Sequence, residues 1–306
     1  MQRRTFLSGL ALTVCSGCMS HSRQLSVGSK NFTEQLILGE ILKQSLESSC
    51  HVPVDGRFYL AGTYICQQAI LAGRIDCYVE YTGTALAAIL KQRPSGDSEA
   101  VYELVKGEYK KRFNLDVLPP LGFNNSFAMI MRGDAAQRLG VTTLSQLTRF
   151  APQLRLGVGY EFLERQDGYK GLVQTYDLCF AAAPRVMDLG LLYRALQNDS
   201  VDIVAGNNTD GLIRTLDLAV LKDDRHYFPP YDAVPIVRPE LFEKCPQARP
   251  MFESLAGRIG SDEMRAMNYA VDGQKQDAAA VARRFLAHLR DLRLSAMPLL
   301  SLPRWR

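Results

Sequence analysis

Short apolar strands and amphipathic helices alternate along this chain, and they do so in two successive blocks. In the first block, Leu25 to Gly28 and Val52 to Leu60 are predicted strands, each followed by a helical stretch. In the second block, predicted strands at Leu154 to Val158 and Val201 to Ala205 flank a predicted helix at Met187 to Leu196. Such alternation favours an α/β fold with mainly parallel sheets, because parallel strands need a long, usually helical, connection.

Two proline-rich loops separate the blocks. Pro119 to Phe127 contains two prolines, one glycine and two asparagines, and Phe228 to Pro235 contains three prolines. These residues mark loops rather than core elements. We therefore expect two crossings between two lobes that close by hinge motion around a ligand in the cleft. The predicted segments are lobe 1 at 24–125 and 231–292, lobe 2 at 126–230, and an irregular C-terminal tail at 293–306.

Residues 1–18 have the organisation of an export signal. Arg3 and Arg4 precede the apolar run Gly9 to Val14, in an order that resembles a twin-arginine signal. Ser16-Gly17-Cys18 resembles a lipobox, although Cys15 stands where leucine is usual. The apolar run is too short to span a bilayer. We therefore expect export to the periplasmic or cell-surface side, where lipidation of Cys18 anchors the protein to a membrane.

After Cys18 the chain has five further cysteines: Cys50, Cys66, Cys77, Cys179 and Cys245. An odd number without a CxxC pair argues against a metal site or a disulfide framework. One disulfide bond remains an alternative, because disulfides form in exported proteins. Because Cys66, Cys77 and Cys179 lie in apolar runs, the sequence favours buried free thiols there.

Composition and charge exclude several classes of function. Hydrophobic residues make up 47% of the 306 residues, and the net charge is only +4. No basic face is interleaved with aromatic residues, so nucleic acid is not an expected partner. The four histidines are scattered, and we find no nucleophile elbow or phosphate-cradling glycine loop. We therefore expect no catalytic residues, no metal and no cofactor.

The stretch Ile75 to Leu86 indicates a binding site. It is predicted to be a buried strand, a tight turn and a helix start, with Thr82 or Thr84 as N-cap and Gly83 allowing close approach. A helix N-terminus attracts an anion, and the adjacent ring of Tyr81 suits a cation, so the pair suits a zwitterion. The alternative is an ordinary turn beside a core tyrosine. Upstream, a second helix start is predicted where Asn31 and Glu34 have capping-box spacing.

Six motifs stand out along the chain: Gly28-Ser29-Lys30-Asn31-Phe32-Thr33-Glu34-Gln35, Glu80-Tyr81-Thr82-Gly83-Thr84, Gly122-Phe123-Asn124-Asn125, Arg165-Gln166-Asp167-Gly168, Thr209-Asp210-Gly211 and Phe228-Pro229-Pro230-Tyr231-Asp232. Together they resemble the glycine betaine/choline-binding proteins of osmoprotectant ABC importers. They occur in the family's order, and the resemblance extends from residue 25 to about residue 292. It implies a two-lobe, class II periplasmic-binding-protein fold, a quaternary ammonium ligand and a membrane permease as partner.

The resemblance also implies site residues. In the family, tyrosine rings surround the ammonium head, which cannot donate a strong hydrogen bond and is held by cation–π attraction. The four cage positions fall on Tyr81, Phe127, Asn207 and Tyr231. A carboxylate tail would be bound by the arginine that falls on Arg165. The remaining positions implied to line the cleft are Thr84, Lys30, Gln35 and Asn125.

Because of two departures from the family pattern, the sequence does not fix the identity of the ligand. Phe127 keeps the ring but loses a hydroxyl, and Asn207 replaces a ring by an amide that both donates and accepts hydrogen bonds. A polar amine or an ergothioneine-like betaine is therefore an alternative ligand. Tyr64, Tyr160 and Tyr169 are candidates to rebuild the cage. An exported enzyme and a sensor role are further alternatives, and the chain is expected to be a monomer.

Overall fold

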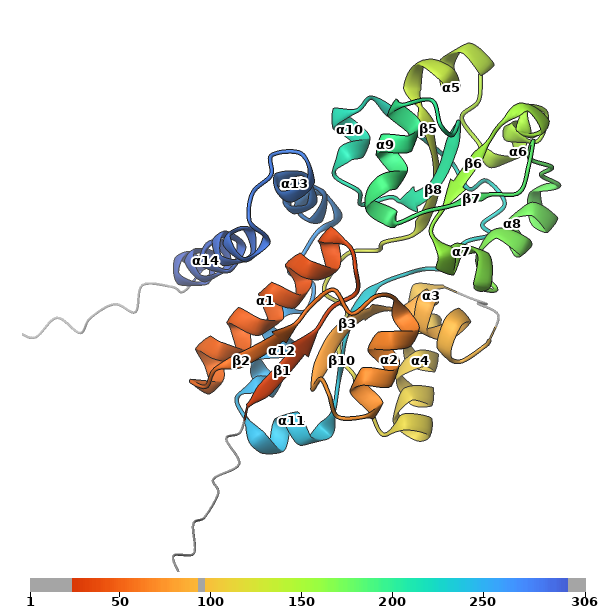
Figure 1. Ribbon diagram of the computed structural model, residues 1–306. Coiled ribbons are helices and arrows are strands. Elements are labelled where there is room, and N and C mark those ends of the chain that lie inside the picture. The colour runs from red at the N-terminus through yellow and green to blue at the C-terminus, as the bar shows by residue number, and fades with distance from the viewer. Residues whose placement is uncertain (1–23, 93–96, 297–306) are drawn as a thin grey trace, which may run out of the picture.

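The computed structural model describes residues 24–92 and 97–296, which form two lobes, each built on a five-stranded sheet with helices around it (Figure 1). This confirms the predicted α/β two-lobe fold. In lobe 1 the strand order is β2-β1-β3-β10-β4, and in lobe 2 it is β7-β6-β8-β5-β9. The strands are β1 (Leu25–Gly28), β2 (Val54–Arg57), β3 (Cys77–Tyr81), β4 (Asp116–Val117), β5 (Phe127–Arg132), β6 (Leu156–Val158), β7 (Arg185–Val186), β8 (Ile203–Asn207), β9 (Leu218–Leu221) and β10 (Ala233–Val237).

Helices connect and cover these strands. Those of the first part of lobe 1 are α1 (Thr33–Cys50), α2 (Thr63–Leu71), α3 (Thr82–Thr84), which continues as a π-helix over Ala85–Ile89, and α4 (Ser98–Phe113). Those after β5 are α5 (Gly133–Leu139), α6 (Leu144–Leu147), α7 (Tyr160–Glu164), α8 (Tyr169–Tyr176), α9 (Leu192–Gln197) and α10 (Leu212–Thr215). The last four are α11 (Pro239–Lys244), α12 (Ala248–Leu255), α13 (Ser261–Asp272) and α14 (Ala278–Ala296).

Both sheets follow one plan. In lobe 1, β1 pairs in parallel with β2 and β3, and β10 is antiparallel to its neighbours β3 and β4. In lobe 2, β6 pairs in parallel with β7 and β8, and β5 is antiparallel to β8 and β9. The antiparallel strand in each sheet is the one that enters from the other lobe. The prediction of mainly parallel sheets is therefore correct only for the three strands at one side of each sheet.

The two crossings between the lobes run side by side. The chain leaves lobe 1 through residues 118–126 and returns through residues 222–232. The Asn125 backbone N–H donates to the Tyr231 carbonyl at 3.0 Å, and the Leu121 N–H donates to the Ala233 carbonyl at 2.8 Å. The two hydrogen-bonded segments form a connection between the lobes that can bend as a unit. The exact residues at which the lobes begin and end stay a prediction.

The C-terminal helices complete lobe 1. Helices α12, α13 and α14 pack against α1, which lies next to them in Figure 1. Met264, Phe285 and Leu289 from these helices share one buried cluster with Leu38 and Leu42 of α1. The first helix and the last helices of the described residues therefore contribute to the same hydrophobic core.

A disulfide joins Cys50, at the end of α1, to Cys245 after α11, across a sequence separation of 195 residues. Cys66 and Cys77 are buried free thiols, as expected. Cys179 is exposed, so the prediction of a buried thiol is wrong there. A cross-link of this span stabilises mainly by restricting the unfolded chain, typically by about 2–4 kcal/mol.

Several local predictions are wrong. Phe32 precedes α1 in extended conformation and no side chain caps the helix, so the capping box from Asn31 does not form. The segment 187–196 begins with non-helical residues and a short 3-10 turn, and the α-helix starts only at Leu192. Helix α14 continues to Ala296, so 293–296 are helical rather than irregular. The export signal, Cys18 and residues 297–306 lie outside the described residues.

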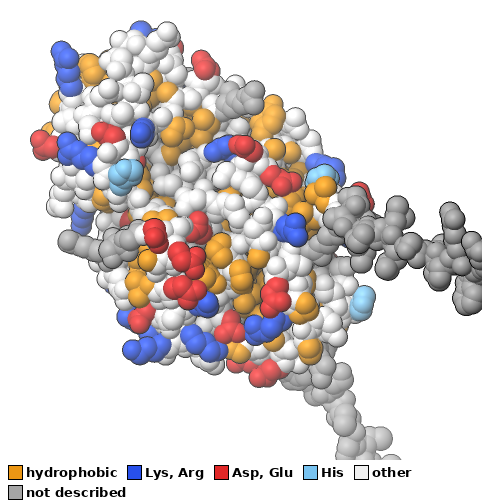
Figure 2. Space-filling model, turned by 180° about the vertical axis from the view of Figure 1, so that it is seen from behind, with side chains coloured by type: hydrophobic (Ala, Val, Ile, Leu, Met, Phe, Trp, Pro, Cys, Tyr) orange, Lys and Arg blue, Asp and Glu red, His pale blue; other side chains and the backbone are white. Residues whose placement is uncertain are grey.

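Charged side chains of both signs are interspersed over the face seen in Figure 2. Within residues 24–92 and 97–296, no helix combines the length and the hydropathy that crossing a bilayer requires.

Candidate ligand-binding site

A cavity of about 310 Å³ lies between the lobes. Its lobe 1 wall comes from loops that follow β1, β2 and β3, and its lobe 2 wall from residues at or after the ends of β6, β7 and β8. The carboxyl ends of the parallel strands in both sheets thus face one another, which is where open α/β sheets bind ligands. The lining residues are Lys30, Asn31, Phe32, Gly62, Tyr81, Thr84, Asn125, Phe127, Gly159, Tyr160, Glu161, Phe162, Arg165, Val186, Met187, Asp188, Leu189, Ala205, Asn207 and Tyr231.

Aromatic side chains dominate the cavity wall. Phe127 is central: its ring centroid lies 5.0 Å from that of Phe162 and 5.8 Å from that of Tyr231, both in edge-to-face geometry. Phe32 stacks near Tyr81 with centroids 6.4 Å apart. Tyr160 completes a set of six aromatic lining residues. These rings come from both lobes and from the crossings, so ring faces meet around the cavity only when the lobes lie together.

Arg165 is buried against two of these rings. Its guanidinium carbon lies 4.7 Å from the Phe127 centroid and 5.8 Å from the Tyr231 centroid. Asp167 accepts from Arg165 Nε at 2.9 Å and from Nη2, so one edge of the guanidinium is already occupied. Burial alone lowers the pKa of Arg165, but the charge of Asp167 reverses that effect and raises it, so the side chain stays charged.

Lys30 repeats this arrangement in lobe 1. Its ammonium nitrogen lies 5.0 Å from the Tyr81 ring centroid and forms an ion pair with the fully buried Glu80. Glu80 also accepts from the Tyr81 backbone N–H at 2.8 Å. At the cavity wall, Lys30 and Arg165 are therefore each paired with a carboxylate of their own.

Glu34 is a buried hydrogen-bond centre beneath the cavity. It accepts from the Tyr81 hydroxyl at 2.6 Å, from Asn125 Nδ2 at 2.7 Å and from Asn268 Nδ2 at 3.0 Å. Burial raises the pKa of Glu34, while hydrogen bonds from these side chains counteract the rise. Asn268 also donates to the Thr209 carbonyl at 2.9 Å, which links this centre to lobe 2.

The structure brings eight of the nine predicted site residues to the cavity wall: Lys30, Tyr81, Thr84, Asn125, Phe127, Arg165, Asn207 and Tyr231. Gln35 is buried behind the wall, where its Oε1 accepts from the Lys30 backbone N–H at 3.5 Å.

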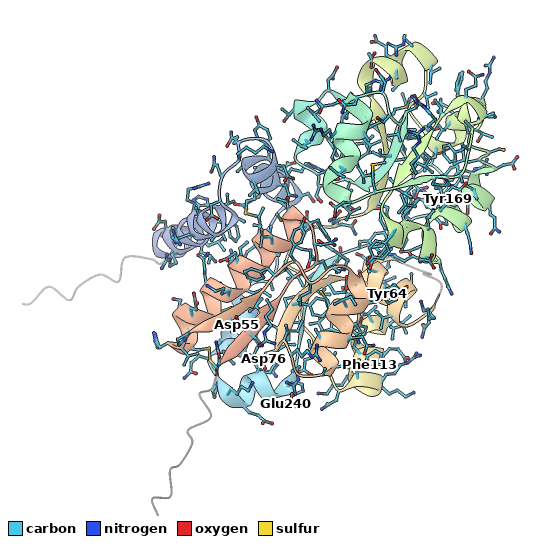
Figure 3. The ribbon with its side chains drawn as sticks, in the orientation of Figure 1. Asp55, Tyr64, Asp76, Phe113, Tyr169 and Glu240 are labelled. Carbon is cyan, nitrogen blue, oxygen red and sulfur yellow. A yellow bond between two sulfur atoms is a disulfide. The ribbon has the colours of Figure 1, made fainter. Side chains whose placement is uncertain are left out.

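Of the three tyrosines considered for rebuilding the cage, only Tyr160 lines the cavity. Figure 3 shows Tyr64 on lobe 1 and Tyr169 on lobe 2, and each has another partner: Lys91 donates to the Tyr64 hydroxyl, and Tyr169 packs near Phe180.

Sequence reasoning missed Phe32, Phe162 and Glu161, although a signal was present. Phe32 lies in the loop between β1 and α1, and the other two follow β6, at the strand ends where cleft residues collect. Within the described ranges, no group of three or more His, Cys, Asp or Glu side chains is placed to hold a metal ion.

The turn after Tyr81 differs from the prediction. Neither Thr82 nor Thr84 caps α3; the Thr82 hydroxyl instead donates to the Pro230 carbonyl at 3.2 Å and accepts from the Asp232 N–H at 3.0 Å. At Gly83, a Cβ would lie 2.7 Å from the Pro230 carbonyl oxygen. The glycine therefore allows close approach of the returning crossing, which positions Tyr231 beside the cavity.

Comparison with known proteins places this geometry in a family. Residues 23–288 match the family OpuAC, described as the substrate binding domain of ABC-type glycine betaine transport system. The chain belongs to this family. Its members capture substrates for ABC transporters and are not enzymes, which confirms the predicted role and rejects the enzyme alternative. As a substrate-binding protein of an importer, it acts outside the cytoplasm with a membrane permease.

Similar proteins cover most of this substrate-binding protein. The carnitine transport binding protein OpuCC of Listeria monocytogenes is 34% identical over 92% of this chain and 91% of its own length. The ergothioneine transport permease/ergothioneine binding protein EgtU of Helicobacter pylori is 35% identical over 87% of this chain and 48% of its own length. A crystal structure of a glycine betaine/carnitine/choline ABC transporter protein superimposes with a TM-score of 0.72, at 30% identity, over 87% of this chain and 99% of its own.

The lobes of the binding protein also touch at one rim of the cavity. Glu161 of α7 accepts from the Thr63 backbone N–H at 2.7 Å, so a lobe 2 carboxylate caps the N-terminus of α2 in lobe 1. A side chain at position 62 would displace the atoms that make this contact. A Cβ there would lie 2.0 Å from Glu161 Oε1 and 2.7 Å from the Tyr160 hydroxyl oxygen.

We expect Gly62→Ala to weaken ligand binding by about tenfold, because the added methyl separates the rims and makes the closed form less populated. Isothermal titration calorimetry measures the dissociation constant. Gly107→Ala is the matched control: no atom lies within 4 Å of a Cβ at that position, and its dissociation constant should not change. An unchanged affinity in Gly62→Ala would show that this rim contact does not contribute to binding.

Asp210 organises the lobe 2 loop that carries Asn207. The Asn207 N–H donates to Asp210 at 2.9 Å, and the Tyr193 hydroxyl donates to the same oxygen. Burial raises the pKa of Asp210 to about 7, with smaller contributions from the charges of Glu34 and Asp272, although both hydrogen bonds oppose the rise. The carboxyl group is therefore protonated over a wider pH range in the folded protein than in the unfolded chain.

We expect the free energy of unfolding to fall as the pH rises from about 4 to about 7 through this group, since the unfolded chain loses the Asp210 proton first. Above that range the contribution is constant. Asp210→Asn, which keeps an acceptor but cannot ionise, should remove the slope relative to wild type in urea unfolding across that range. Parallel curves for wild type and variant would contradict a raised pKa at Asp210.

Proposed function

We propose that this substrate-binding protein captures a small quaternary ammonium compound, of the glycine betaine, carnitine or choline type, in the cavity between its lobes. The observation that carries the proposal is the wall of six aromatic side chains at the facing strand ends. A trimethylammonium group presents only methyl groups, so ring faces hold it through cation–π attraction and methyl contacts, at about 2 kcal/mol per desolvated ring. The cavity volume of about 310 Å³ suits a small ligand.

The charges around the cavity also favour a cation. Lys30 is paired with Glu80, and Arg165 with Asp167, so neither pair adds net positive charge. The lining carboxylates Glu161 and Asp188 accept from backbone amides, at Thr63 and Gly190. With both pairs neutral, these two carboxylates leave the wall with negative charge, which suits a ligand of positive charge.

Buried polar atoms at the cavity wall and just behind it provide for a second group on the ligand. Asn125 Oδ1 and Gln35 Nε2 are buried atoms that lack a hydrogen-bond partner within the described part of the chain. Buried polar atoms of native proteins are normally paired, so these two favour a ligand that offers hydrogen bonds. Carnitine and ergothioneine, bound by the relatives whose names state it, each combine a trimethylammonium with a carboxylate.

An ergothioneine-like betaine or another polar amine is the second candidate. Asn207 lines the cavity where a family member would place a cage ring, and its amide suits a ligand with a polar ring better than a bare trimethylammonium head. The relative EgtU, which is named for ergothioneine, matches 87% of this chain.

We expect a thermal-shift screen of glycine betaine, carnitine, choline and ergothioneine to raise the melting temperature with at least one of them, because a ligand that binds only the folded form stabilises it. For that ligand, Tyr81→Ala should weaken binding by about tenfold or more in calorimetry. Tyr64→Ala is the control, since Tyr64 does not line the cavity. No shift with any of the four ligands would overturn the proposed ligand class, and equal losses in both variants would remove Tyr81 from the site.

We further propose that the mature protein is a monomer held at the membrane through lipidated Cys18. The support is the sequence of residues 16–18 and the family's partnership with a permease. Sedimentation of the soluble form at the mass of one chain tests the monomer.

Cys18→Ala should shift the exported protein from the membrane fraction to the soluble fraction, because the variant lacks the thiol that receives the lipid. Fractionation followed by immunoblotting measures this, with Cys179→Ser as the control because that exposed cysteine lies far along the chain. Retention of Cys18→Ala in the membrane would argue against lipidation at this position.

A further inference from the structure

Asp167 contacts two residues of the cavity wall, Arg165 and Tyr231. It pairs with both Nε and Nη2 of Arg165, and one of its oxygens accepts from the Tyr231 hydroxyl at 2.6 Å. The Arg165 side chain is 4% exposed and that of Asp167 is 2% exposed. A charge this well buried interacts strongly with its surroundings, because little water screens it.

The position of Arg165 makes its charge important for the ligand. Its guanidinium lies over the rings of Phe127 and Tyr231, which are two of the rings proposed to contact the ammonium head. An unpaired guanidinium there would repel a nearby ligand cation, because little water screens a buried charge. It would also attract a ligand carboxylate to its Nε–Nη2 edge, which Asp167 now occupies.

We propose that Asp167 is a specificity-determining residue: by neutralising Arg165, it lets the cavity accept a cation that has no carboxylate, and it limits the preference for zwitterions. The inference rests on the proposed function, since it concerns which quaternary ammonium ligands bind. Asp167 itself is a positioning residue, which acts through Arg165 and Tyr231 and not by touching the ligand.

The test compares choline, which is a cation, with glycine betaine, which carries the same head and a carboxylate. The measured quantity is the ratio of the choline to the glycine betaine dissociation constant, by calorimetry. Asp167→Asn leaves the pair with a net positive charge and should raise the ratio by about tenfold or more. Arg165→Gln leaves a net negative charge and should lower the ratio.

The double variant Arg165→Gln/Asp167→Asn decides between charge balance and direct binding. If charge balance sets specificity, the neutral pair restores the ratio to near the wild-type value. If Arg165 binds the ligand carboxylate directly and Asp167 is only structural, the double variant keeps the lowered ratio of Arg165→Gln, which would overturn the inference. An unchanged ratio in both single variants would overturn it as well.

Asp202→Asn is the matched control. Asp202 forms the same two-bond contact, at 2.8 and 2.9 Å, with Arg155 in the same lobe, and neither residue lines the cavity. It should leave the ratio unchanged. If Asp167→Asn fails to fold, the opposite shift in Arg165→Gln and the recovery in the double variant still test the inference. Wild-type protein that binds neither ligand would instead count against the proposed function.

Discussion

The cavity depends on the pairing of the two segments that cross between the lobes. Residues 121–125 of the outgoing segment hydrogen-bond to residues 231–233 at the end of the returning segment, and each segment continues into the antiparallel strand of the sheet that it enters. Asn125, Phe127 and Tyr231 lie on or next to these segments and line the cavity. The connection between the lobes is therefore itself part of the binding wall, and Gly83 is the residue that lets the returning segment come close enough.

Two cations are buried beside aromatic rings, and each would be energetically unfavourable without a partner of opposite charge. Lys30 with Glu80 and Arg165 with Asp167 are both nearly inaccessible to solvent, and each carboxylate also binds the residue whose ring faces the cation. An unpaired buried charge costs several kcal/mol, roughly, so each cation needs its carboxylate in place before a ligand arrives. Rings, cations and carboxylates thus form two local units, one in lobe 1 and one that joins Arg165 and Asp167 of lobe 2 to Tyr231 of the returning crossing.

The sequence was sufficient for the fold class and for eight of the residues that line the cavity, because strand ends and motifs coincide. Tyr81 and Asn207 are the last residues of β3 and β8, and Arg165 follows the short helix α7 that comes after β6, so the topology brings them to the facing strand ends of the two sheets. The details that failed depend on tertiary contacts. Thr82 has a side chain typical of N-caps, but its hydroxyl hydrogen-bonds the returning crossing instead. Asn31 does not cap α1, because Phe32, in extended conformation, is the residue that precedes the helix. The Cys50–Cys245 bond joins residues whose proximity is set by the packing of α1 against the C-terminal helices, which no local pattern encodes.

Strand β10 sits between β3 and β4 in the first sheet, yet it follows the whole of the second lobe in the chain. A nascent polypeptide that ends before residue 233 therefore has two strands with bare facing edges, separated by the width of the missing one. Such edges are sites for wrong pairing between molecules. Lobe 2 is continuous in sequence, so all of its strands are synthesised before β10. It can therefore fold while lobe 1 still lacks that strand.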